Sequence, residues 1–130
     1  MEYVNFAGLP SHRHFERAAK YLPQGPGSVF SFGVKGGRAA GQKFIESLQL
    51  ASHLANVGDA RTLVIHPGST THQQLSAEQL VTAGIPEDLV RISIGLEDLD
   101  DILWDIDQAL DLATATPQGS TPTPHEGATA

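Results

Sequence analysis

The sequence predicts an α+β fold, in which a small sheet is covered by helices on one face. Short segments with the alternation or β-branched composition of strands are separated by segments whose apolar residues recur at helical spacing. No predicted strand is longer than seven residues, and the 130 residues are near the usual size of one domain. One compact unit with its own core is therefore expected.

The N-terminal region is expected to hold one helix and one strand. The helix follows Ser11, whose hydroxyl can cap it, and ends before Pro23. Residues 28–34 alternate and are rich in β-formers, which predicts a strand. The Lys35-Gly36-Gly37 turn ends this strand. The apolar stripe of the helix is Phe15, Ala18, Ala19 and Leu22.

A second helix is predicted over residues 38–55. Residues 56–59 end it, because Gly58 suits the left-handed position that follows a helix. The short apolar run 62–65 then predicts another strand. The stripe of this helix follows spacings of three and four residues: Ala40, Phe44, Leu48, Ala51 and Ala55.

The C-terminal half is expected to hold two helices around one strand. Ser76 and Gln79 have the spacing of a capping box, which predicts a short helix closing near Gly84. Residues 89–94 alternate, which places Arg91 and Ser93 on one face of a strand. The last helix starts near Asp98, and its predicted buried stripe is Leu99, Ile102, Leu103, Ile106, Leu110 and Ala113.

Charge is distributed unevenly along the chain, whose net charge is −7. Residues 1–91 carry eight basic and seven acidic side chains, whereas the remainder carries eight acidic and no basic ones. This balance provides no basic surface for nucleic acid or anionic lipid, so neither partner is expected. The acidic residues near the start of the last helix are interpreted as a solvated face at its positive end.

Residues 114–130 contain no large apolar side chain, which predicts a disordered tail after a domain of residues 1–113. No segment has the pattern of a signal peptide, and none approaches the ~20 apolar residues of a membrane span. A cytoplasmic location is therefore expected. The chain has no cysteine, which excludes disulfides and thiolate chemistry.

Two patterns suggest sites without completing them. His12 and His14 are close in sequence, as are His66 and His72, but no acidic cluster completes a familiar ligand set, so no metal site is predicted. Residues 33–37 join a strand to a helix, as phosphate loops do. They match neither the Walker A motif nor the dinucleotide fingerprint, and a tight turn is the favoured interpretation.

Arg91 is the strongest candidate from the residues alone. It lies mid-strand among apolar neighbours, where an unpaired guanidinium is costly to bury. Its planar fork suits the carboxylate of an amino or organic acid. A structural salt bridge to one of the nearby acidic side chains is the alternative, and the residues alone favour it.

Several motifs together resemble the C-terminal part of the Cys/Met-metabolism pyridoxal-phosphate (PLP) enzymes. The most specific pair is HPxSTTH at residues 66–72 and RxSxGxED at residues 91–98. Segments 29–37, 44–48 and 56–63 are also similar, and the likeness extends over residues 3–112 in the family's order and spacing. Residues 52–60 are most similar to the O-acetylhomoserine sulfhydrylases within this family.

The resemblance implies the C-terminal domain of a fold-type I PLP enzyme, with a mostly antiparallel sheet. It also implies a reaction in which O-acetylhomoserine loses acetate and gains sulfide to give homocysteine, with PLP as the electron sink. Matched to the family's motifs, Arg91 would bind the substrate α-carboxylate, and Asn56 and Thr71 would line the same wall. Relatives often carry serine at the position of Asn56, and no residue of this chain takes a catalytic role.

The resemblance also implies what the chain does not contain. Relatives are several times longer, and none of Lys20, Lys35 and Lys43 lies in the family's cofactor-lysine context. We therefore expect a truncated or excised domain that is inactive and binds no PLP by itself. Its partner would be an N-terminal PLP domain, in a homo-oligomeric enzyme. The alternatives are a stand-alone non-catalytic module, or the equivalent domain of a cystathionine synthase or lyase or a methionine γ-lyase.

Overall fold

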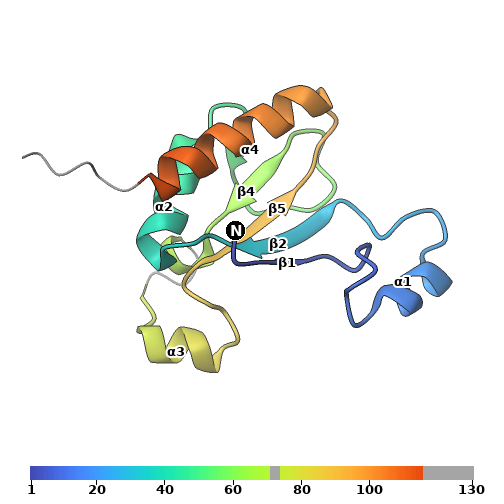
Figure 1. Cartoon of the computed structure of the whole chain (residues 1–130), viewed down its shortest axis with the longest axis horizontal. Coiled ribbons are helices and arrows are strands. Elements are labelled where there is room, and N and C mark those ends of the chain that lie inside the picture. Colours follow the sequence, from blue (N-terminus) through green and yellow to red (C-terminus); the bar gives the residue numbers. More distant parts are fainter. Residues whose placement is uncertain (71–73, 116–130) are drawn as a thin grey trace, which may run out of the picture.

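The computed structural model describes residues 1–70 and 74–115, in which strands and helices are interleaved (Figure 1). The strands are β1 (Tyr3–Asn5), β2 (Val29–Gly33), β3 (Ser52–His53), β4 (Leu63–Ile65) and β5 (Leu89–Ser93). The helices are α1 (Phe15–Tyr21), α2 (Gly37–Ser47), α3 (Ala77–Thr82) and α4 (Leu99–Thr114), with one 3-10 turn at Pro67–Ser69.

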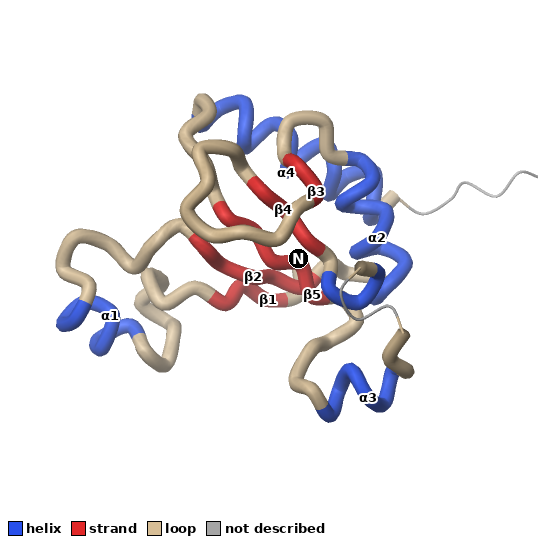
Figure 2. Tube along the Cα trace, turned by 180° about the vertical axis from the view of Figure 1, so that it is seen from behind, coloured by secondary structure: helices blue, strands red, loops and turns tan. Residues whose placement is uncertain are grey.

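The strands form one sheet in the order β1-β2-β5-β4-β3. All neighbouring strands are antiparallel except β3 and β4, which are parallel. Helices α2 and α4 lie together on one face of this sheet (Figures 1 and 2). The predicted small, mostly antiparallel sheet with helices on one face is confirmed.

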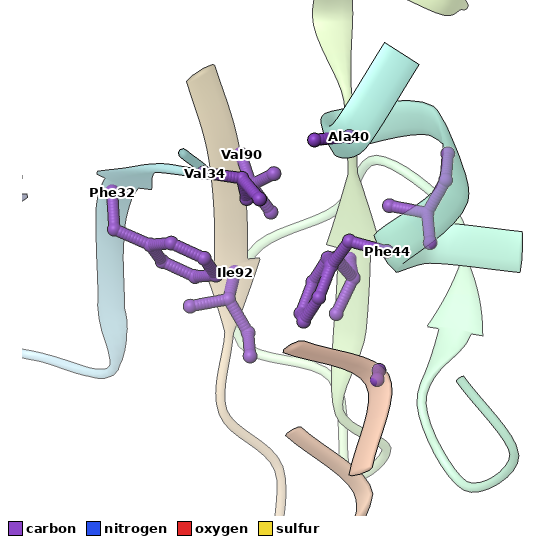
Figure 3. Close-up of a cluster of buried hydrophobic side chains, with 9 residues drawn as sticks. Phe32, Val34, Ala40, Phe44, Val90 and Ile92 are labelled. Atoms are coloured by element: carbon purple, nitrogen blue, oxygen red, sulfur yellow. The ribbon is translucent and has the colours of Figure 1, made fainter. Parts of the chain in front are cut away.

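The hydrophobic core lies between the sheet and these two helices. Phe32 of β2 and Phe44 of α2 are fully buried and pack edge to face, with ring centroids 5.5 Å apart (Figure 3). Val90 and Ile92 of β5 enter the same cluster from the middle of the sheet. Burying side chains of this size contributes about 1.5–3 kcal/mol each, so this cluster is the main source of the domain's stability.

The strand-to-helix turn before α2 depends on two glycines. Gly36 has φ +111° and Gly37 has φ +69°, both in the left-handed region that side chains disfavour. A Cβ at Gly36 would also press against the side chain of Ala40. The interpretation of residues 33–37 as a tight turn agrees with this geometry.

The prediction for the second helix was wrong at its C-terminal end. Helix α2 ends at Ser47, and Leu48 is already extended with ψ 140°, so Ala51 and Ala55 are not helical. The backbone N–H groups of residues 49–51 donate to the carboxylate of Asp105, which replaces the hydrogen bonds of a further helical turn. Gly58 has the expected positive φ, +76°, but in a loop and not after a helix.

Other differences lie near the ends of the described chain. Strand β1 was not predicted, and α1 begins after His14 without a side-chain cap, so Ser11 does not cap it. No residue of α1 is buried, although its apolar stripe has helical spacing. In α4, Ile102, Ile106, Leu110 and Ala113 of the predicted stripe face the core, whereas Leu99 and Leu103 are 65% and 55% exposed, and Asp105 and Ala109 are buried beside the stripe.

The short helix α3 follows its prediction closely. The hydroxyl of Ser76 accepts the N–H of Gln79 at 3.3 Å, and the Gln79 side chain accepts the N–H of Ser76 at 2.8 Å. Both bonds of the predicted capping box are therefore present. Almost all of the tail expected over residues 114–130 lies outside the described residues; Thr114 is the last residue of α4. Within the described ranges, no helix is long and apolar enough to cross a membrane.

Candidate functional site

Arg91 lies in the middle of β5 on the sheet face that points away from α2 and α4. Its neighbours Val90 and Ile92 are fully buried in the core, and alternate residues of a strand point to opposite faces. Across the ladder, Arg91 is paired with Ser31 of β2 and Ile65 of β4. Figure 2 views this face, with the connection between β3 and β4 passing in front of the strands.

Arg91 is half-buried, and no ion pair within the described residues engages it. In residues 1–70 and 74–115, the one ion pair joins Arg61 to Asp59, from Nε to Oδ1 at 3.9 Å. The salt bridge that was the alternative interpretation of Arg91 is thus not formed within these ranges. The N–H groups of a half-buried guanidinium without an ion pair can donate two parallel hydrogen bonds to a planar carboxylate.

Ser93 lies two residues further along the same face of β5. Its side chain is 2% exposed, and its Oγ has no hydrogen-bond partner within the described part of the chain. Buried hydroxyls are nearly always hydrogen-bonded, because an unpaired one costs about 1–3 kcal/mol. The Arg91 face therefore holds two polar groups whose partners are missing from the described residues.

Asn56 lies in the connection between β3 and β4, where the sequence predicted the residues that end a helix. Its side chain is exposed, and its Oδ1 accepts the N–H of Val57 at 2.8 Å. No hydrogen bond joins Asn56 to Arg91, so these two predicted ligands are not in direct hydrogen-bond contact. Thr71, the third predicted site residue, lies outside the described residues.

Glu97 fastens the end of that connection to the chain that follows β5. Its carboxylate accepts the backbone N–H of Thr62 at 2.6 Å and the Thr62 hydroxyl at 2.7 Å. The same hydroxyl accepts the N–H of Gly95 at 3.0 Å. Burial alone would raise the pKa of Glu97, but the backbone and side-chain hydrogen bonds from Thr62 outweigh it and lower that pKa.

Asp105 fastens the other end of the same region, just before β3. Its buried carboxylate accepts the N–H groups of Gln49, Leu50 and Ala51 at 2.7, 2.9 and 2.9 Å, and Gln108 donates to it as well. Burial raises the pKa of Asp105, and the three backbone donors together with Gln108 lower it further than burial raises it. The carboxylate is therefore held ionised inside the fold.

Sequence reasoning missed the roles of both carboxylates. Glu97 belongs to an acidic run, and such a run is normally a solvated face, while Asp105 was given no role. One signal was available for Asp105: it lies three residues after Ile102 and four before Ala109, on the stripe that faces the core. For Glu97 the signal was its place in the RxSxGxED motif, which marks the position but does not indicate a bond to Thr62.

His66 is a fully buried structural histidine. Its Nε2 lies 2.6 Å from the backbone oxygen of Glu87 and its Nδ1 lies 2.8 Å from Oγ of Ser69. Because a carbonyl only accepts, Nε2 carries the proton and Nδ1 accepts from Ser69. Burial lowers the pKa of His66, and the Glu87 carbonyl opposes this only in part. Both ring nitrogens are thus occupied.

His12 and His14 lie in the N-terminal arm, away from His66. The Nε2 of His12 lies 2.8 Å from Oδ1 of Asn5, and its Nδ1 accepts the N–H of His14 at 3.1 Å. The His12 ring therefore links residues 12–14 to Asn5 of β1 and to one another. Within residues 1–70 and 74–115, no group of three or more His, Cys, Asp or Glu side chains is placed to hold a metal ion.

Comparison with known proteins places this geometry in a family. The model of the Cys/Met metabolism PLP-dependent enzymes matches residues 1–111. The chain belongs to this family. The resemblance drawn from the HPxSTTH and RxSxGxED motifs is thereby confirmed.

The related proteins include sulfhydrylases of bacteria and yeast. O-acetyl-L-homoserine sulfhydrylase 1 of Thermus thermophilus is 53% identical over 83% of this chain and 26% of its own length. The homocysteine synthase of Schizosaccharomyces pombe is 50% identical over 87% of this chain and 26% of its own length. The chain therefore spans about a quarter of the length of these relatives.

Solved structures of the family share the fold. A structure described as an O-acetylhomoserine (thiol)-lyase of Campylobacter jejuni, which contains N'-pyridoxyl-lysine-5'-monophosphate, gives a TM-score of 0.73 at 38% identity over 83% of this chain and 26% of its own. Cystathionine gamma synthase of Xanthomonas oryzae, solved with cystathionine, gives 0.73 at 35% identity over 86% and 29%. The fold-type I prediction for this domain is confirmed.

The residues of this chain do not fit PLP as a cofactor of their own. Lys20, Lys35 and Lys43 are the only lysines of the sequence, and all three are exposed on α1, the β2–α2 turn and α2. None is enclosed in the way a lysine bonded covalently to PLP inside an active site must be. No chemical step can therefore be assigned to PLP on this chain.

Proposed function

We propose that this chain is the domain that binds the substrate carboxylate in a PLP-dependent O-acetylhomoserine sulfhydrylase, which makes homocysteine from O-acetylhomoserine and sulfide. The cofactor and the catalytic groups would come from an upstream domain, and the chain would be inactive without it. The observation that carries the proposal is the half-buried Arg91, which no ion pair within the described residues engages.

The role of this chain is to bind and orient, not to transfer protons. The guanidinium of Arg91 would hold the α-carboxylate of O-acetylhomoserine through two parallel hydrogen bonds. Asn56 and Thr71 would line the same wall of the site. A substrate whose carboxylate is held at a fixed point would present its other atoms to the upstream domain in one orientation. Such orientation of the reacting groups lowers the entropic cost of the reaction.

Exposed apolar side chains give independent support. Leu54, Val57 and Leu96, on the connection between β3 and β4 and on the segment hydrogen-bonded to it, are 50%, 62% and 87% exposed. An apolar surface of this kind suggests an interface with other protein.

A hybrid enzyme tests the proposal directly. Residues 1–115 of this chain would replace the matching region of the Thermus thermophilus sulfhydrylase, and the release of homocysteine from O-acetylhomoserine and sulfide would be measured. We expect the hybrid to be active and the isolated chain to have no activity and no stoichiometric PLP. A hybrid that folds and binds PLP but makes no homocysteine would contradict the proposal.

Replacing Arg91 within the hybrid identifies the carboxylate ligand. Truncating one partner of a buried charged pair costs about 2–5 kcal/mol, so Arg91→Ala should lower kcat/KM for O-acetylhomoserine about a hundredfold or more, mostly through KM, with PLP still bound. Arg61→Ala removes an exposed arginine whose side chain is 68% accessible and is the matched control. An unchanged KM in Arg91→Ala would return Arg91 to a structural role.

A further inference from the structure

The connection that carries Asn56 is fastened near its C-terminal end by a junction of two backbone segments. Residues 60–62 precede β4, and residues 95–97 follow β5. The N–H of Leu96 donates to the oxygen of Ala60 at 2.8 Å, and a Cβ at Gly95 would overlap the backbone of Ala60 and Arg61. Only glycine allows this close approach of the two segments.

Glu97 makes the side-chain bonds of that junction. It accepts both the N–H and the hydroxyl of Thr62, and Thr62 in turn accepts the N–H of Gly95. The Thr62 side chain is thus held between the two segments, and Thr62 itself is 1% exposed. Hydrogen bonds to an ionised carboxylate are about twice as strong as neutral ones. Glu97 therefore provides the strongest link in this junction.

The junction lies between the two predicted ligands of the carboxylate. Arg91 is four residues before Gly95 on the same strand and its extension, and Asn56 is on the connection that Thr62 ends. Strands β4 and β5 are themselves paired, with Ile65 opposite Arg91, so the strand side of the site is already fixed. What the ladder does not fix is the course of residues 54–61 over the sheet.

We propose that Glu97 is a positioning residue for substrate binding: through Thr62 it sets the place of the connection bearing Asn56 relative to Arg91. Glu97 does not touch the substrate. The inference rests on the proposed function, because it assigns Glu97 to the carboxylate site described there. Loss of Glu97 should weaken substrate binding at Arg91 without removing any group that contacts the substrate.

The hybrid enzyme described above provides the test, with O-acetylhomoserine as the probe. Glu97→Ala should raise KM for O-acetylhomoserine about tenfold while kcat changes less than threefold, since the interaction lost is one of binding geometry. Glu97→Gln keeps the shape and one acceptor oxygen for the Thr62 N–H but loses the charge and the second acceptor, so it should restore part of the affinity. KM for sulfide should not change.

Asp98→Ala is the matched control. Asp98 is the adjacent carboxylate and caps α4 by accepting the N–H of Asp100 at 2.9 Å, but it makes no hydrogen bond to residues 54–62. Its loss destabilises the fold through the helix cap. If a general loss of stability were the cause of weak binding, Asp98→Ala would raise KM as much as Glu97→Ala does. That result would overturn the inference.

A double-mutant cycle separates positioning from an independent structural effect. If Glu97 acts by placing Asn56, Glu97→Ala should add little to the KM of an Asn56→Ala hybrid, so the two effects should be strongly non-additive. Full additivity, or a Glu97→Ala hybrid with unchanged KM, would overturn the inference while the proposed function stands. An inactive parent hybrid would instead remove the proposed function and this inference with it.

Discussion

The two faces of the sheet differ in how completely they are built. The face under α2 and α4 is a closed apolar core, in which Phe32, Phe44 and Ile92 are buried by neighbours within the chain. The opposite face presents Arg91, with no ion pair to it within the described residues, and the buried hydroxyl of Ser93, also without a partner there. One face therefore closes the core, and the other carries the site that we propose for the substrate carboxylate.

The same division separates stability from activity in the chain. Core substitutions should unfold the domain, and substitutions on the Arg91 face should change what it binds or what it assembles with. Asp105 and Glu97 lie at the boundary: Asp105 holds residues 49–51 before β3, and Glu97 holds the end of the connection that runs over the open face. Variants in the core, at the boundary and on the Arg91 face test whether the two faces differ in this way.

The largest effect is expected for Phe44→Ala. Phe44 is fully buried and packs on Phe32, so its loss removes apolar burial and leaves a cavity, which typically costs about 3–5 kcal/mol. The free energy of unfolding, from urea titration of the isolated chain, measures it. Leu103→Ala on the exposed side of α4 is the control and should change stability by less than about 0.5 kcal/mol. Similar losses in both variants would contradict the assignment of the core.

Asp105→Asn should have the next largest effect. An amide cannot accept the three N–H groups of residues 49–51 as the carboxylate does, so at least one buried donor loses its partner. Leaving such a group unpaired costs about 1–3 kcal/mol, and more where a charge is involved. Urea titration measures the loss, and Asp107→Asn, an exposed acid of the same helix, should cost less than about 0.5 kcal/mol. Equal losses would show that Asp105 does not hold the loop.

Stability should fall below neutral pH because of His66. Burial lowers its pKa in the folded state below the ordinary value of 6.5, so the unfolded chain binds the proton first. Its contribution is therefore fully present above pH 6.5 and is lost as the pH falls from 6.5 through the lowered pKa. The lowered pKa values of Glu97 and Asp105 act in the same direction at more acidic pH.

The measurement is the urea midpoint between pH 8 and pH 5 for the parent chain and for His66→Gln. The parent should lose stability over this interval, and the variant should show a flatter profile because the group that titrates has been removed. The comparison of slopes isolates His66 from the other histidines. Identical slopes would mean that His66 is not the titrating group.

How far the sequence predicts this molecule depends on the range of the interactions involved. Strands β2 and β5 and helix α3 follow from local alternation and from the capping box. The end of α2 does not, because it is set by Asp105, which lies 56 residues from Gln49 in the sequence. No local pattern in residues 38–55 records that bond.

Some residues of the candidate site can likewise be predicted from the local sequence, and others cannot. Arg91 could be found because a guanidinium in the middle of an apolar strand is unusual wherever it occurs. Glu97 could not, because an acidic residue before a helix is common and its bonds to Thr62 join segments 35 residues apart. The orphaned hydroxyl of Ser93 could be recognised only after the fold had buried it.

The smallest expected effect is also the one that tests the open face most directly. In the isolated chain, Ser93→Ala removes a buried hydroxyl that has no partner in the described residues, so stability should stay equal or rise by up to about 1 kcal/mol. In the hybrid enzyme the sign should be the same, because this chain's own atoms already enclose the hydroxyl and an upstream domain cannot reach it. Thermal unfolding of both proteins measures the sign, with the exposed Ser28→Ala as control.

The same sign in the two proteins would mean that the Ser93 hydroxyl is unpaired in both, so that assembly completes this face at Arg91 and not at Ser93. A loss of stability in the isolated chain would show that Ser93 already has a partner there, and the contrast between the two faces would then rest on Arg91 alone. A loss in the hybrid alone would mean that the strands around Ser93 rearrange when the enzyme assembles, which would contradict a domain that folds before it assembles.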